Sequence, residues 1–240
     1  MLNERQEHIL RAVVDEYVRS GEPVASKVIV DRYLTEVSPA TVRGDMAALE
    51  ELGYVYQPHT SAGRVPTEVG YKYYIDHFIR VERADKIATE LRDAVNNADS
   101  PSAMLRAAAK ALSSMSGHAA IVSGEDSGPQ VSGLANLLHE PEFDDMERRT
   151  TVATALDRAE TAIAELLQLV HQDEVTVWIG RENPLGAELA SVVIRVRLPN
   201  GEVGMLGLMG PLRMRYGRNI GLLQEVKKLL DRSFDNDQEL

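Results

Sequence analysis

The sequence predicts an α+β fold in two parts, and three observations support this prediction. The N-terminal part shows short amphipathic helical segments followed by a hairpin pattern, whereas the C-terminal part alternates helical segments with strand-like runs. A chain of 240 residues exceeds the roughly 150 residues of a common domain, which favours two domains. Apolar residues make up 44% and charged residues 26%, as is usual for folded globular proteins.

The first two helices are predicted from their start and stop residues. Asn3 and Gln6 have capping-box spacing, and the stretch 21–23 (Gly-Glu-Pro) ends the helix that they begin. Ser26 is then placed to cap a short second helix over residues 27–33.

The third helix has the clearest start, because Ser38 can cap it, Pro39 suits the first helical position and Gly53 can end it. The face predicted to be buried consists of Val42, Met46, Leu49 and Leu52. The opposite face consists of Ala40, Gly44 and Ala47, with Thr41 and Arg43 beside them. Small residues next to an arginine let a helix lie close to a DNA groove. The alternative is a merely solvated helix face, but a glycine within a helix destabilises it by about 1 kcal/mol relative to alanine, and a solvated face does not account for that cost.

A hairpin is predicted after the third helix. Residues 54–57 read as a strand, 59–63 as a turn and 64–65 as a return strand, after which Thr67 can cap a helix through Ile79. Helices followed by a hairpin in this order are typical of a winged helix-turn-helix, and a generic small helical domain is the alternative.

The remainder of the chain predicts an antiparallel hairpin with flanking helices. Residues 81–116 look helical with a break near 99–101, and residues 117–133 are rich in Gly and Ser. One long helix is predicted over 142–171 and a last one over 212–230, after a sheet ended by Gly210-Pro211. The predicted strands are 175–179, 191–198 and 203–209, with an Asn-Gly turn within 199–202.

Composition excludes several classes of site. The chain has no cysteine, and its six histidines show no metal-binding spacing, so we expect no metal and no cofactor. Catalytic motifs are lacking as well, so we expect no enzyme. The sequence shows neither a signal peptide nor an apolar run of about 18 residues, which predicts a soluble cytoplasmic protein that does not enter membranes.

Net charge argues only weakly against nucleic acid. The total is −11, but residues 1–80 carry nine Lys/Arg and twelve Asp/Glu, a net charge of −3, so most of the acidity lies in the second part. A local basic face on the first part is compatible with these numbers, although composition alone does not show one.

Three further residues of the first part are candidate DNA contacts. Arg64 is expected near the tip of the hairpin, where a cation could meet a phosphate or the minor groove, although a solvated turn arginine is the alternative. Lys27 opens the second helix, from which phosphates are usually bound. His59 could donate to a phosphate or cap the turn.

Two candidates in the second part have simpler structural explanations. Arg213, Arg215 and Arg218 could bind an anion at the last helix, but a solvated helix face is more common. Trp178 lies in a predicted strand and is assigned to the core.

Several sequence blocks resemble a known family. They are Leu2–Gln6, Gly21–Val24, Val37–Arg43, Asp45–Tyr54 and Gln57–Thr67 in the first part, and Gly133–Leu134, Asn136–Leu138, Pro141–Phe143, Ile179–Asn183 and Gly210–Tyr216 in the second. In this order they resemble the heat-inducible transcription repressor family HrcA. The resemblance covers most of residues 1–80 and 131–232.

The resemblance implies a homodimeric transcriptional repressor of heat-shock (chaperone) genes. Its winged helix would bind double-stranded DNA at an inverted-repeat operator of the CIRCE type, a GAF-like domain would follow, and the GroE chaperonin would be a further partner. The implied organisation is a DNA-binding domain over 1–80, a helical linker and shortened region over 81–130, and a reduced GAF-like α+β domain over 131–240.

Two departures from the family matter. Position 44 usually carries asparagine in the family, and Gly44 has no side chain that could read a base. The family also carries further strands and a dimerisation insert where this chain has only residues 117–132, so we expect a shortened member whose dimer forms elsewhere.

The repressor hypothesis has two rivals, a small-molecule-sensing winged-helix regulator that uses the GAF-like domain and an enzyme. The candidate DNA-binding residues are Lys27, Ser38, Ala40, Thr41, Arg43, Gly44, His59, Ser61, Gly63 and Arg64.

Overall fold

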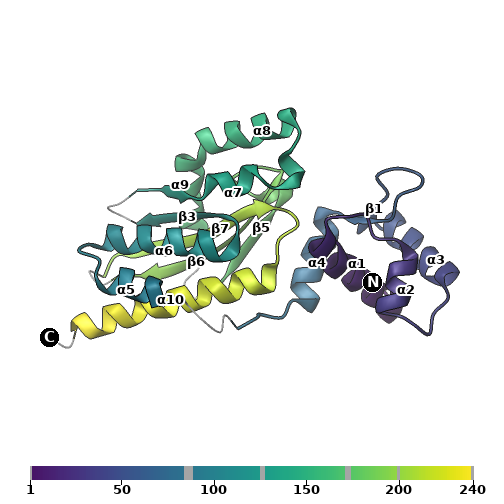
Figure 1. Cartoon of the computed structure of the whole chain (residues 1–240), viewed down its shortest axis with the longest axis horizontal. Helices are drawn as coiled ribbons and strands as arrows, with labels where there is room; N and C mark the ends of the chain where they lie inside the picture. The colour runs from purple at the N-terminus through teal and green to yellow at the C-terminus, as the bar shows by residue number, and fades with distance from the viewer. Residues whose placement is uncertain (1, 84–88, 125–127, 171–173, 199–200, 239–240) are drawn as a thin grey trace. The chain divides into compact units, whose positions relative to one another are not determined.

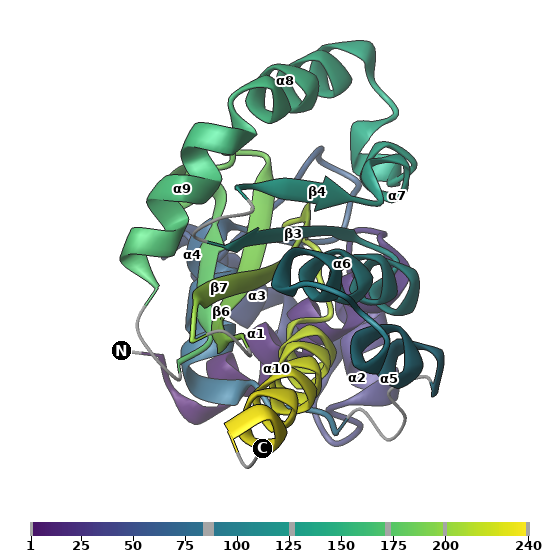
Figure 2. The same cartoon turned by 90° about the vertical axis from the view of Figure 1, so that its left-hand side faces the viewer.

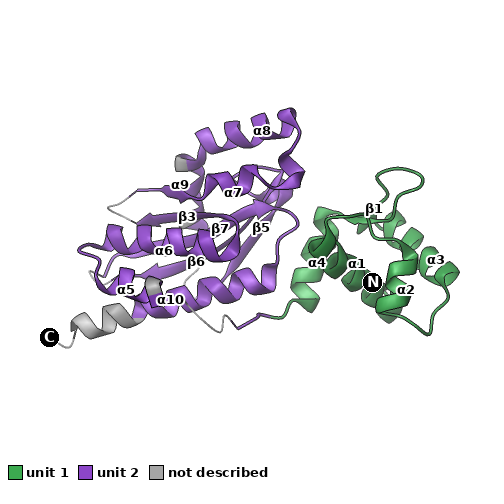
Figure 3. Cartoon of the chain, in the orientation of Figure 1, with its two compact units in different colours: residues 1–80 green, residues 81–240 purple. Residues whose placement is uncertain are grey.

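The computed structural model describes residues 2–83, 89–124, 128–170, 174–198 and 201–238. It contains two compact units, Met1–Arg80 and Val81–Leu240 (Figures 1 and 3). Helices and antiparallel sheets occur together, so the predicted α+β class is confirmed.

The first unit consists of helices and one small antiparallel sheet. Its elements are α1 (Glu4–Ser20), α2 (Ser26–Arg32), α3 (Pro39–Glu51), β1 (Val55–Tyr56), β2 (Val65–Pro66) and α4 (Glu68–Phe78). The caps lie where the sequence predicted them, since Asn3 and Gln6 form a capping box and the side chains of Ser38 and Thr67 accept backbone hydrogen bonds at the starts of α3 and α4.

Two details of the helix predictions are wrong. Ser26 lies inside α2 rather than capping it; Ala25 holds the cap position and offers no side-chain hydrogen bond. Leu52 is 55% exposed, because it is the C-cap of α3 and lies beyond the turns whose Val42, Met46 and Leu49 are buried.

Ion pairs connect α1 to the two helices that follow it. The buried carboxylate of Glu16 on α1 accepts from Arg32 Nη1 (2.6 Å) and Tyr33 Oη (3.2 Å), and it also pairs with Arg19. Arg5 Nε donates to the buried Asp45 on α3 (2.6 Å). These contacts fix α2 and α3 against one common helix.

The loop between β1 and β2 approaches the chain just before α2. Val24 and Arg64 exchange two backbone hydrogen bonds of 2.9 Å, as an isolated antiparallel bridge. A Cβ on the neighbouring Gly63 would lie 2.3 Å from the carbonyl carbon of Val24, so only glycine allows this approach. The hairpin is thereby held at its loop as well as at its strands.

The second unit is a five-stranded antiparallel sheet with helices on both faces (Figure 2). The strand order is β4-β3-β7-β6-β5. The strands are β3 (Ala119–Gly124), β4 (Gln130–Ser132), β5 (Thr176–Ile179), β6 (Leu189–Arg197) and β7 (Val203–Pro211). The helices are α5 (Thr89–Asn96), α6 (Pro101–Ser116), α7 (Leu134–Leu138), α8 (Met146–Asp157), α9 (Ala159–Leu169) and α10 (Tyr216–Gln238), with 3-10 turns η1 (Pro141–Phe143) and η2 (Gly180–Glu182).

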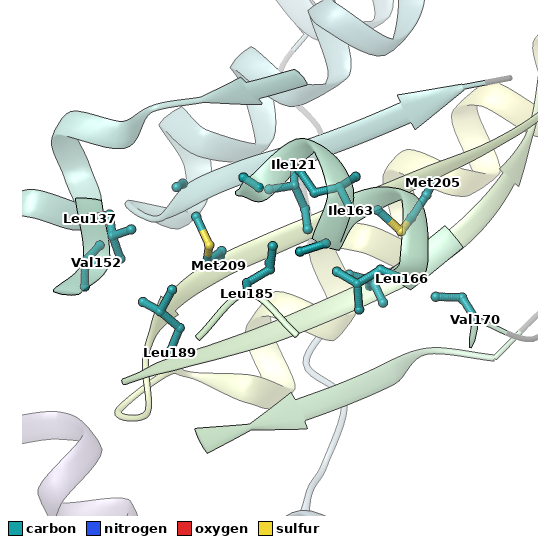
Figure 4. Packing of buried hydrophobic residues seen from close by; sticks show 14 of the residues in the cluster. Ile121, Leu137, Val152, Ile163, Leu166, Val170, Leu185, Leu189, Met205 and Met209 are labelled. Atoms are coloured by element: carbon teal, nitrogen blue, oxygen red, sulfur yellow. The ribbon is translucent and has the colours of Figure 1, made fainter. Parts of the chain in front are cut away.

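One face of this sheet packs against α7, α8 and α9 (Figure 4). Its core includes Ile121, Val193 and Met205, and Trp178 packs against it partly buried, as predicted. Gly207 stands opposite both Ile121 and Val193, and a Cβ there would lie 2.6 Å from each side chain. The missing side chain therefore leaves room for side chains of β3 and β6 to approach each other over the central strand β7. The other face packs against α6 and α10.

Several predictions for the second unit need correction. Residues 81–130 are not a separate linker, because α6 and β3 form part of the core of the second unit. The long helix over 142–171 is two helices, α8 and α9, interrupted at Arg158, and His171 lies outside the described residues. β7 extends through Gly210 and Pro211, which pair with β6, so the strand ends at Pro211 and not at Met209 as predicted.

The predicted helix over 212–230 begins later, at Tyr216, because residues 212–215 connect the sheet to it. The predicted Asn-Gly turn includes Pro199 and Asn200, which lie outside the described residues.

The ion pairs of Glu16 should make the stability of the fold depend on pH. Hydrogen bonding from Arg19, together with that from Arg32, lowers the pKa of Glu16. A folded-state pKa below the unfolded value stabilises the fold above the unfolded pKa of about 4.3, and this contribution is lost as pH falls through the folded pKa. We expect Glu16→Gln to lower the denaturation midpoint at pH 7 and to flatten its fall towards pH 3. Urea unfolding at several pH values measures this. A midpoint that falls as steeply with acid in the variant as in the parent would contradict the expectation.

Gly44 and Gly63, the two glycines among the candidate DNA-binding residues, should respond in opposite directions to replacement by alanine. A Cβ at Gly44 in the middle of α3 would meet nothing within 4 Å, so Gly44→Ala should stabilise the chain by about 1 kcal/mol. Gly63→Ala should destabilise it, because its Cβ would overlap the Val24 backbone. Thermal unfolding of the two variants beside the parent checks this. A raised midpoint in Gly63→Ala would show that the approach at Gly63 is not tight, and a lowered midpoint in Gly44→Ala would contradict the first expectation.

Candidate nucleic-acid interface

The solvent face of α3 carries four of the ten candidate residues. Ala40, Thr41, Arg43 and Gly44 are all exposed, and Ala47 is half-buried. Ser38 is exposed as well, but its Oγ accepts from the Thr41 backbone at 3.1 Å, so it serves as the helix cap. The buried side of the same helix is held by Val42, Met46 and Leu49. α3 therefore presents small residues and one arginine to solvent.

Lys27 and two loop residues are also exposed. Lys27 lies in the first turn of α2. His59 and Ser61 lie in the β1–β2 loop, where Ser61 Oγ is 3.3 Å from His59 Nδ1. These side chains are accessible to a partner.

A surface hollow of about 430 Å³ joins α3 to the loop and to the start of α2. Of the candidate residues it brings together Arg43, Ser61, Gly63 and Arg64. The other residues that line it are Val24, Ala25, Ser26, Met46, Gln57, Thr60 and Ala62. The remaining candidates, among them Lys27 and His59, do not line the hollow. Gln57 and Thr60 were not among the predicted residues, because their positions depend on how the loop folds back.

Arg64 does not lie at the exposed tip of the hairpin, and that prediction is wrong. Its side chain is only 15% exposed, and its Nη2 lies 2.7 Å from Glu50 Oε2 on α3. The cause is the backbone bridge to Val24, which places Arg64 where the loop meets the body of the unit. Gly63, next to it, serves the same close approach.

Two of the candidate cations differ from the paired arginines of the first unit. Ion pairs engage Arg5, Arg11, Arg19, Arg32 and Arg64. Lys27 and Arg43, in contrast, have no ion-pair partner among the described residues. An exposed cation without a carboxylate partner is available for a phosphate. These two residues therefore provide the positive charge of the candidate surface, within a unit that is acidic overall.

Other kinds of site find less support. Among the described residues, no group of three or more His, Asp or Glu side chains could hold a metal ion. No helix in the described part of the chain is long and apolar enough to cross a membrane. Arg213, an anion-site candidate, instead pairs with Glu142, with Arg213 Nη2 3.2 Å from Glu142 Oε2.

Comparison with known proteins adds a family. Residues 74–220, more than half of the chain, match the family model described as the HrcA protein C terminal domain. The "Heat-inducible transcription repressor HrcA" of Shouchella clausii is 28% identical over 338 aligned positions, which cover 95% of this chain and 97% of that protein. The protein of the same name from Acidothermus cellulolyticus is 55% identical over 82 residues, 34% of this chain and 24% of its own length.

A solved structure supports the fold. The crystal structure of a hypothetical protein superposes with a TM-score of 0.73 at 20% identity, covering 99% of this chain and all of that chain. At this identity the likeness concerns the fold alone. The assignment to a family therefore rests on the family model and the aligned relatives. The chain belongs to the HrcA family, whose relatives named above are heat-inducible transcription repressors.

Proposed function

We propose that this chain is a transcriptional repressor of heat-shock genes that binds double-stranded DNA through its first unit. In this proposal the first unit is a winged helix-turn-helix, α3 is the recognition helix and the β1–β2 loop is the wing. The observation that carries it is the exposed Arg43 on α3, which has no ion-pair partner among the described residues and lines a hollow shared with the loop. Helices of this kind enter the major groove, and a loop beside them can reach the backbone.

The small residues of α3 fit close approach to a groove. Ala40 and Gly44 are exposed and add little bulk, while Thr41 and Arg43 offer hydrogen-bond donors. Lys27 in the first turn of α2 would contact a phosphate, a position from which backbone contacts set the orientation of the protein. The glycine at position 44 leaves room for a larger side chain, because a Cβ there would meet nothing within 4 Å.

The second unit would supply the dimer. The alignment with the Shouchella clausii protein runs over 338 positions, whereas this chain has 240 residues, so that relative has roughly a hundred residues without a counterpart here. This difference supports a shortened member with a reduced GAF-like domain.

A homodimer would present two copies of α3 to an inverted repeat, and we propose an operator of the CIRCE type. GroE chaperonin is the further partner that we propose.

Salt dependence of binding tests the whole proposal. Full-length protein should bind an inverted-repeat duplex with an affinity that falls steeply as salt rises, because phosphate contacts release counterions. Failure to bind the duplex, or binding that ignores both salt and the repeat, would reject the proposal. A pure small-molecule sensor without a DNA site would give the first of these results.

Replacing the exposed cation of α3 should weaken binding without unfolding the protein. We expect Arg43→Ala to cost about 1–3 kcal/mol at one base pair if it reads a base, or to lower the salt slope by about 1 if it contacts a phosphate. Arg11→Ala, which removes an exposed cation paired within α1, is the matched control and should change little. Fluorescence anisotropy at several salt concentrations measures both. If Arg43→Ala bound with the affinity and the salt dependence of the parent, α3 would not be part of the interface.

Assembly should reside in the second unit. We expect a fragment of residues 1–80 to sediment as a monomer and to bind the inverted repeat far more weakly than the full chain, because a single half-site loses the gain from linked binding. Analytical ultracentrifugation of the fragment and the full chain makes the comparison. A fragment that dimerises as strongly as the full chain would place the dimer contact in the first unit instead.

A further inference from the structure

The carboxylate of Glu50 on α3 contacts the hairpin at two points. Its Oε1 accepts from the backbone N–H of Gln57, at the end of β1, over 3.0 Å. Its Oε2 lies 2.7 Å from Nη2 of Arg64, at the start of β2. One side chain therefore holds both ends of the loop against the helix.

The side chain of Gln57 continues this network into the loop. Its Nε2 donates to the backbone carbonyls of Thr60 (3.0 Å) and Ala62 (2.8 Å). Within the loop, the N–H of Ala62 donates to the carbonyl of His59 over 2.8 Å. The loop is thus folded around one amide group, which is itself attached to α3 through Glu50.

The same loop is attached to the start of α2 by an independent contact, the paired backbone hydrogen bonds of Val24 and Arg64. Three segments that are separate in the sequence, namely residues 24–26, α3 and the loop, are therefore joined through residues 57–64. They also line the hollow described above.

We infer that Glu50, Gln57 and Arg64 form a brace that sets the position of the β1–β2 loop relative to α3, and that Arg64 acts through Glu50 rather than by touching DNA. This inference rests on the proposed function, because the positioned surface is the proposed DNA-binding surface. A loop that is already ordered costs less entropy when it binds, so the brace raises affinity without adding a contact.

The burial and charge of Arg64 distinguish positioning from contact. The side chain is mostly buried, and its charge is matched by Glu50. One of its donors is already taken by Glu50 and little of its surface is accessible to a phosphate, whereas Arg43 is exposed and has no ion-pair partner among the described residues. The two arginines lining one hollow should therefore differ in how they affect salt dependence.

The salt slope of operator binding provides the first test in full-length protein. We expect Gln57→Ala and Arg64→Ala each to weaken binding by up to about tenfold, as for the loss of one or two hydrogen bonds, with the slope of the parent. Arg43→Ala is the comparison and should change the slope by about 1 if it contacts phosphate. A slope reduced by about 1 in Arg64→Ala would make Arg64 a phosphate contact and overturn the inference. Gln57→Ala, which removes no charge, carries the test if Arg64→Ala does not fold.

Amide hydrogen exchange without DNA provides the second test. Both variants should speed exchange at the N–H of Ala62 while leaving the buried turns of α3 protected. Unchanged exchange at Ala62 in both would overturn the brace. If the parent binds no duplex but exchange at Ala62 rises in both variants, the proposed function fails and the brace remains.

Discussion

The shape of the candidate surface depends on the close passage of the loop at Gly63 past the backbone of Val24. Two hydrogen bonds between Val24 and Arg64 hold this passage together, and any side chain at position 63 would prevent it. From it follow the inward direction of Arg64, its pairing with Glu50 and the hollow that the loop shares with α3. Without this contact the loop would lose its attachment to the chain just before α2.

α1 fixes the positions of α2 and α3. Its Glu16 binds α2 through Arg32 and Tyr33, and its Arg5 binds α3 through Asp45. The carboxylates of both pairs are buried, which makes them intolerant of losing a partner. These arginines neutralise carboxylates of an acidic unit, and they leave Lys27 and Arg43 as exposed cations without an ion-pair partner among the described residues.

Local signals in the sequence predicted the elements well, and non-local contacts account for the errors. Asn3, Ser38 and Thr67 cap helices through atoms only a few residues away, so their patterns were sufficient. The direction of Arg64 depends on Glu50, fourteen positions earlier, and no periodicity reveals that pairing. β4 was missed for a similar reason: its three residues gain their partners only from β3, across a segment that reads as a Gly- and Ser-rich loop. For the candidate site, the exposed face of α3 was predictable, whereas the role of Gln57 was not.

The outer strands of the larger sheet are its shortest members. β4 has three residues and β5 four, whereas the inner β6 and β7 have nine each. Short outer strands offer few unsatisfied backbone groups on which a foreign strand could add. Addition of further chains to the edges of this sheet, the route by which heated β-proteins polymerise, is therefore disfavoured.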